Sequence, residues 1–144
     1  MPQSIARQLI DTHPLGYGTL DRKKLEAAIL GLAEAGQAAA SCGDAILSAN
    51  LLKDMTACLR TCLDATDVAE AAVRVLSRAT AYDPAVTGRV LEAAVAVLDR
   101  CGDECARHAS MHMHCRICSE TCRRASAAAQ EMLAGVEGRV PNVS

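Results

Sequence analysis

The segment that decides the fold is residues 101–122, which read CGDECARHASMHMHCRICSETC. It holds five of the eight cysteines and three of the four histidines of the chain. Its cysteines recur mainly at intervals of three and four residues, so on a helix their side chains share one face. Thiolate ligands favour Cu(I), zinc and iron–sulfur clusters. The segment therefore predicts a soft-metal site carried by helices.

The composition limits both the fold and the function. The chain has 144 residues, which suits one domain with a real core. It is 51% hydrophobic, and its aromatic residues are Tyr17 and Tyr82. A core built from Ala, Leu and Val favours closely packed helices. The formal net charge is −2, and aromatic stacking platforms are missing, so we expect no nucleic-acid partner.

The sequence also predicts the compartment. The first residues contain no apolar core of a secretory signal. No run of about 18 apolar residues indicates a membrane span. We therefore expect a cytoplasmic protein without a membrane partner, in which the thiols stay reduced.

Four long amphipathic segments are expected to form helices, at residues 21–47, 51–80 and 84–109, and from 111–114 to 133. A shorter helix is expected within residues 4–10, capped by Ser4. Apolar and cysteine side chains recur at intervals of three and four in each long segment, which is typical of a bundle core. Short connections predict an all-α fold, an antiparallel four-helix bundle with a short extra N-terminal helix.

This topology divides the chain into a segment at 1–20 with the short helix, a bundle at 21–134 and a flexible tail at 135–144. The tail is expected because Gly135, Gly138 and Pro141 interrupt the helical pattern. Three glycines in the first long helix, Gly31, Gly36 and Gly43, are expected at points of close packing.

An antiparallel arrangement places all eight cysteines at one end of the core, and Ala, Leu and Val fill the other end. His108 and His112 continue the cysteine positions and are the favoured imidazole ligands, whereas His114 is expected to point outward. Met111 is also expected at a core position, and Met113 lies beside it in the connection. The predicted metal ligands are Cys42, Cys58, Cys62, Cys101, Cys105, Cys115, Cys118, Cys122, His108, His112, His114, Met111 and Met113.

Zinc is the main chemical competitor, because Cys115, Cys118 and His112 provide part of a tetrahedral site. Small zinc domains combine two separated motifs on turns, however, whereas these cysteines form a continuous helical stripe. Iron–sulfur clusters use loops, and a di-iron bundle needs Glu-x-x-His motifs, which the chain lacks. Cu(I) fits best, because it is soft and accepts two or three thiolates. The cysteine pairs spaced by four residues, which could grip one Cu(I) each, are Cys58–Cys62, Cys101–Cys105 and Cys118–Cys122.

The pattern Cys58-x3-Cys62-Leu-Asp, followed by Cys101-x3-Cys105-x2-His108-x3-His112-x-His114-Cys115-x2-Cys118-x3-Cys122-Arg-Arg, resembles the cysteine-rich four-helix-bundle copper storage proteins. The resemblance covers the last three long helices, and the first through Cys42 alone. It implies several Cu(I) ions per monomer inside the bundle and a protein of the cytosolic type. It also implies assembly as a homotetramer, with a copper chaperone as a possible partner.

The chain departs from this family at core positions where further cysteines are expected. Alanine occupies four of them, at Ala65, Ala69, Ala125 and Ala129. The copper capacity is therefore expected to be reduced, with the bound copper confined to one end of the bundle. Buffering or transfer of copper is then a further function to consider beside storage.

The leading hypothesis is a cytosolic Cu(I)-binding protein that stores or buffers copper through thiolates, with no enzymatic activity, since no nucleophile–base pair is visible. One alternative is a thiol-based zinc or redox sensor. Another is a metal-free helical interaction module.

Overall fold

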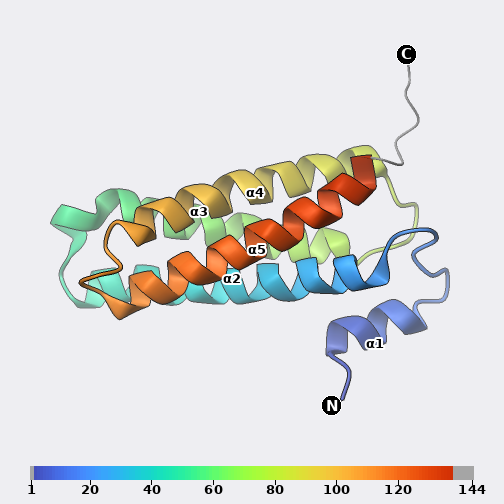
Figure 1. Ribbon diagram of the computed structural model, residues 1–144, viewed down its shortest axis with the longest axis horizontal. Coiled ribbons are helices and arrows are strands. Elements are labelled where there is room, and N and C mark those ends of the chain that lie inside the picture. Colours follow the sequence, from blue (N-terminus) through green and yellow to red (C-terminus); the bar gives the residue numbers. More distant parts are fainter. Residues whose placement is uncertain (1, 138–144) are drawn as a thin grey trace.

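The computed structural model describes residues 2–137, and within that range all regular secondary structure is helical. The helices are α1 (Ile5–Thr12), α2 (Arg22–Ser48), α3 (Leu52–Leu76), α4 (Pro84–Ala106) and α5 (Met113–Glu137). The four long helices form an antiparallel bundle, and the short α1 lies outside it beside α2 (Figure 1). The predicted all-α bundle with an extra N-terminal helix is confirmed. Among these helices none combines the length and the apolar character that a membrane span requires.

Three helices begin where side-chain caps predict. The Ser4 hydroxyl accepts a hydrogen bond from the Arg7 amide at the start of α1. Asp21 accepts from the Lys24 amide at the start of α2. Asp83 caps α4, whose first residue is Pro84. These side chains satisfy amide groups that have no partner within the helix.

The helix ends differ from the predicted ones. The second long helix ends at Leu76 rather than Thr80, and the third at Ala106 rather than Ala109. The last helix instead continues past Gly135 to Glu137. A glycine in a helix costs about 1 kcal/mol, and the burial of Val136, which is 1% exposed, offsets that cost. Residues 138–144 of the predicted tail lie outside the described residues.

The helix α1 is held on α2 by one buried side chain and three polar contacts, one of which is the ion pair of Arg22 with Asp11 at 3.0 Å. Ile10 is 2% exposed, and the Ser4 hydroxyl donates to Glu26 Oε1 at 2.6 Å. Arg7 lies 3.8 Å from the other oxygen of Glu26. The short helix therefore covers part of α2 and lies outside the four-helix core.

The core changes character along the bundle. Leu25, Leu32 and Leu91 are completely buried, and they belong to the half near the start of α2 and α4. The other half contains the end of α2, the start of α3, the end of α4 and the start of α5. These four segments meet at one end, where the α2–α3 and α4–α5 connections lie (Figure 1). The chain order alone therefore brings Cys42 of α2 and Cys115 of α5 to the same end.

Candidate metal centre

All eight cysteines are free thiols in the core, each no more than 1% exposed. The end of α2 provides Cys42, and the start of α3 provides Cys58 and Cys62. The end of α4 provides Cys101 and Cys105, and the first half of α5 provides Cys115, Cys118 and Cys122. The buried face of each helix is thus a row of thiols at this end, and we call the eight together the thiol cluster.

The sulfur atoms approach one another mainly across helices. Cys58 Sγ lies 3.5 Å from Cys105 Sγ, and Cys42 Sγ lies 3.9 Å from Cys115 Sγ. Cys101 Sγ lies 3.9 Å from the sulfurs of both Cys62 and Cys118. Cys118 and Cys122, on one helix, are also 3.9 Å apart. The predicted convergence of thiols is therefore present in the structure, but most of the closest pairs join different helices.

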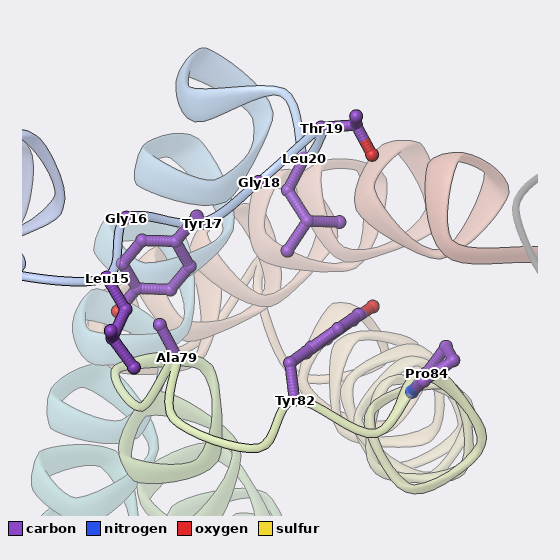
Figure 2. Close-up of a pocket in the computed structure, with 9 residues that line it drawn as sticks. All are labelled: Leu15, Gly16, Tyr17, Gly18, Thr19, Leu20, Ala79, Tyr82 and Pro84. Carbon is purple, nitrogen blue, oxygen red and sulfur yellow. The ribbon is translucent and has the colours of Figure 1, made fainter.

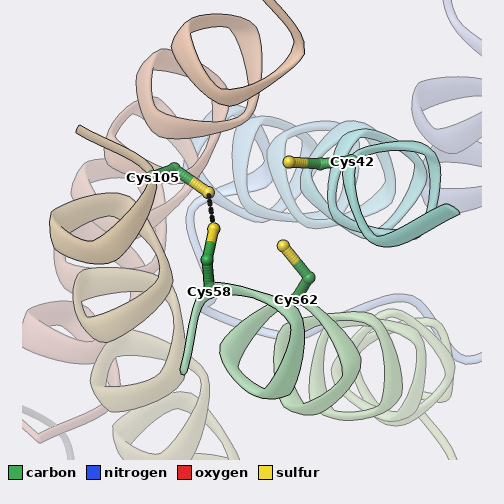
Figure 3. A group of neighbouring side chains, drawn as sticks. All are labelled: Cys42, Cys58, Cys62 and Cys105. Atoms are coloured by element: carbon green, nitrogen blue, oxygen red, sulfur yellow. Dashed lines mark hydrogen bonds between the residues drawn. The ribbon is translucent and has the colours of Figure 1, made fainter. Parts of the chain in front are cut away.

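Two groups of four sulfurs are compact enough to hold a metal. Cys42, Cys58, Cys62 and Cys105 lie within 4.8 Å of one another, and Figure 3 shows their side chains pointing toward a common centre from three helices. A second group contains Cys62 and Cys105 again, with Cys101 and Cys118. Because the groups share two thiols, the cluster is continuous.

The imidazole closest to the thiols is that of His114. Its Nδ1 lies 3.3 Å from Cys42 Sγ and 3.5 Å from Cys115 Sγ, and the three residues form a further group within 4.8 Å. The prediction that His114 points outward is wrong. Since α5 begins at Met113, His114 lies in its first turn and reaches across to α2.

His108 and His112 lie in the α4–α5 connection, and both are half-buried. The amide of His112 donates to the carbonyl of His108 at 3.0 Å, so the connection is a compact turn. The rings of His112 and His114 are 5.4 Å apart. Among the described residues, neither His108 nor His112 belongs to a group that could hold a metal. They lie outside the thiol cluster, in the α4–α5 connection at the same end of the bundle, and we call this connection the mouth.

The two methionines of this end are exposed. Met111 is 78% exposed and Met113 is 64% exposed, so the prediction that Met111 occupies a core position is wrong. Its helical phase was counted through the connection, where the chain is not helical. Met55 and Met132, each 2% exposed, lie in the core.

The buried thiols hold their protons unequally. The pKa of the Cys115 thiol is raised above its ordinary value, mainly because the thiol is buried. Hydrogen bonding with Cys101 is the first cause that raises the pKa of Cys122, to about 12. Hydrogen bonds from neighbouring thiols, with Cys105 first, instead hold the pKa of Cys42 below its usual range. One thiolate can therefore be stabilised by neighbouring S–H donors while other thiols remain protonated.

Polar groups that the sequence did not single out fix the helices around the thiol cluster. The Ser119 hydroxyl donates to the carbonyl of Gly102 at 2.9 Å and joins α5 to α4. Glu104 is 6% exposed and is paired with Arg100 at 3.5 Å and Arg107 at 3.4 Å. The sequence does contain a signal for these ion pairs, because arginines stand four residues before and three residues after Glu104. Such spacings place side chains next to one another on a helix.

The opposite end of the bundle carries a hollow of about 370 Å³. It is formed by the loop from Leu15 to Leu20 and by the segment around Tyr82 and Pro84 (Figure 2). None of the residues that line it is a cysteine, histidine or methionine. This hollow is therefore no part of the metal centre.

The fold and the thiol cluster together define a helical bundle that binds soft metal ions in its core. The model of the copper storage protein family matches residues 21–134. The chain therefore belongs to the copper storage protein family.

Solved structures of one relative agree with this assignment. The copper storage protein Ccsp from Streptomyces lividans, loaded with 10 copper equivalents, is 46% identical to this chain, with a TM-score of 0.88. That match covers 90% of this chain and 98% of the other. A structure of a cytosolic copper storage protein from Streptomyces lividans with five coppers is 48% identical, with a TM-score of 0.77, over 78% of this chain and 94% of that one. Comparison with curated proteins finds no match.

Proposed function

We propose that this protein stores or buffers Cu(I), several ions per monomer, in the thiol cluster. The observation that carries the proposal is the continuous set of eight buried free thiols. Cu(I) is soft and accepts two or three thiolates, and sulfurs that lie within 4.8 Å of one another can bridge neighbouring ions. Each bound ion also neutralises thiolate charge that would be costly to bury alone.

The eight cysteines act as the core ligands in this proposal. His114 adds one imidazole ligand, because its Nδ1 faces the sulfurs of Cys42 and Cys115. His108 and His112, with the exposed Met111 and Met113, make the first contacts with incoming copper at the mouth. Because thiols such as Cys115 and Cys122 are protonated before loading, uptake of Cu(I) releases protons.

Membership of a storage family favours a non-enzymatic role, and we propose that the chain has no enzymatic activity. Streptomyces lividans Ccsp is described as cytosolic, which supports a cytoplasmic location for this chain. Assembly as a homotetramer and delivery by a copper chaperone follow from the family resemblance and stay predictions.

Anaerobic titration of the reduced protein with Cu(I), against a competing chelator, tests the function. We expect uptake on the order of one Cu(I) per thiol, because bridging thiolates are shared between ions. Zn²⁺ should compete poorly for the same sites. If one zinc ion binds tightly and copper uptake stops at one equivalent, the storage function is refuted and a zinc sensor is favoured.

Two double variants separate the mouth from the core. Replacing His108 and His112 by Ala leaves the thiols intact, so loading and removal of copper should slow while the total capacity stays nearly unchanged. Replacing Cys118 and Cys122 by Ser should lower the capacity, because both sulfurs lie in the cluster. Stopped-flow loading and endpoint stoichiometry measure the two effects. Equal loss of capacity in both variants would show that the histidines are core ligands.

A further inference from the structure

A groove between α2 and α5 reaches the thiol cluster from the side of the bundle. Its volume is about 540 Å³, within the range of about 300–1,000 Å³ that small-molecule sites occupy. Cys42 and His114 form its inner end, and Glu34, Gln37, Ser41 and Arg124 contribute polar side chains along its walls. The groove is therefore a second approach to the cluster, distinct from the mouth at the α4–α5 connection.

Among residues 2–137, no carboxylate lies within 4.0 Å of the Arg124 guanidinium, although Glu34 lines the same groove. The other arginines of the thiol half are each within 4.0 Å of an acidic side chain, namely Arg60, Arg100, Arg107, Arg116 and Arg123. Within residues 2–137, the one side-chain partner of Arg124 is the Thr121 hydroxyl at 3.4 Å. A guanidinium without a carboxylate partner, in a groove of this size, is suited to bind the carboxylate of a small ligand.

The contact with Thr121 also sets the direction of Arg124. Side chains on a helix lean toward its N-terminus, and for α5 that is the direction of His114. Thr121 and His114 are seven residues apart on α5, which is about 10 Å along the axis. Ile117 lies between them, lines the groove and is 53% exposed. The spacing suits an elongated ligand with an anionic group at one end and a copper-binding atom at the other.

We propose that this groove binds small anionic thiols of cysteinyl-peptide size and exchanges Cu(I) between them and the Cys42–His114–Cys115 group. The carboxylate of the ligand binds Arg124, its ammonium group faces Glu34, and its sulfur lies at Cys42 and His114. During loading, the Cu–S bond of the donor breaks and a Cu–Sγ bond to Cys42 forms. Because Cys42 binds as a thiolate, the departing thiolate takes its proton from water, and copper remains Cu(I) throughout.

Loading of the reduced full-length protein from two donors tests this site, which rests on the proposed copper function. The donors are the Cu(I) complexes of glutathione and of glutathione diethyl ester, which keeps the thiol and loses both carboxylates. We expect faster loading from glutathione. Arg124→Gln should slow that loading about two- to fivefold, the range for one exposed ion pair, and leave loading from the ester unchanged. Arg123→Gln, which removes a charge paired with Asp103, is the matched control.

A copper-free measurement and the final stoichiometry separate the possible failures. Titration of the apo protein with S-methylglutathione should shift the NMR signals of Thr121 and His114 in the wild type and the Arg123 variant, and not in the Arg124 variant. Equal loading rates from both donors, or equal effects of the two arginine variants, would refute the proposed ligand site in the groove. A normal copper capacity in the same experiment would show that the proposed storage function is unaffected. Loss of copper capacity in the wild type overturns storage, and the S-methylglutathione titration still decides the groove.

Discussion

Two glycines of α2 provide a matched pair of substitutions with opposite expected effects. A Cβ atom added at Gly31 would lie 3.2 Å from the Cα atom of Ala125 on α5. A Cβ atom added at Gly36 would lie 3.8 Å from the Cβ atom of Ala69 on α3, which is ordinary van der Waals contact. Both glycines are inside the helix, so the change in helix propensity is the same at the two sites.

The magnitudes follow from these distances. Alanine in a helix interior is favoured over glycine by about 0.8–1.0 kcal/mol. Gly36→Ala should therefore raise the free energy of unfolding by up to about 1 kcal/mol. At Gly31 the obstacle is a backbone atom, so α2 and α5 must separate, and overpacking of this kind costs about 1–3 kcal/mol. Gly31→Ala should thus be neutral or destabilising by up to about 2 kcal/mol.

Chemical denaturation of the reduced apo protein, with far-UV circular dichroism as the signal, measures both free energies. The comparison is valid when the two variants unfold with the same dependence on denaturant concentration. The Gly36 variant is the control for helix propensity and for any change in the unfolded chain. If both substitutions stabilise the protein equally, α2 and α5 can separate there without cost, and close packing at Gly31 is refuted.

Two further predictions concern the thiols. The pKa of Cys122 is raised to about 12, first by hydrogen bonding with Cys101 and also by burial. Above pH 9.0, the ordinary pKa of a cysteine thiol, the folded protein therefore keeps a proton that the unfolded chain releases. This contribution to stability is complete below pH 9.0 and is lost as the pH rises toward 12. In anaerobic denaturation, the copper-free Cys122→Ser variant should therefore lose less stability than the wild type between these two pH values. An equal loss of stability in both proteins would contradict the raised pKa of Cys122. Second, replacing the buried Ala65 and Ala125 by Cys should extend the thiol cluster and raise the copper capacity by about one or two ions, whereas cysteines at the exposed Ala71 and Ala127 should add no copper that survives a competing chelator.

The periodicity of the sequence predicted the buried face of each helix well. Cysteine and alanine recur at intervals of three and four between polar residues. In the second long helix the positions with this spacing are all buried, namely Met55, Cys58, Cys62, Ala65, Ala69, Ala72 and Leu76. The same pattern, with short connections, was enough to predict that Cys42 and Cys115 meet at one end. These features depend on helical geometry and chain direction alone, and both can be read from the sequence.

The predictions failed where the chain leaves the helix. The cysteine pattern was continued from α4 to His108 and His112, and back from Cys115 to Met111, as if residues 107–112 were helical. This gave the wrong positions for Met111 and His114. A turn resets the helical phase, so a residue beyond it cannot be placed by counting from the preceding helix. The groove was also beyond prediction, because it depends on how closely two helices pack and on which way Arg124 leans.

The arrangement of the core explains how the protein can hold and release copper without losing its fold. The leucine- and alanine-rich half buries large side chains such as Leu25, Leu32 and Leu91 completely, and each is worth about 1.5–3 kcal/mol relative to an exposed side chain. This half contains none of the eight thiols, so its stabilisation does not depend on metal. Small zinc domains are different, because there the ligands also form the fold and removal of the ion unfolds the chain. Here we expect removal of copper to leave mostly neutral thiols, which pack as small apolar side chains. Ala65, Ala69, Ala125 and Ala129 are buried and carry no thiol, so we expect them to lower the copper capacity and to keep the core packed when the thiol cluster is empty.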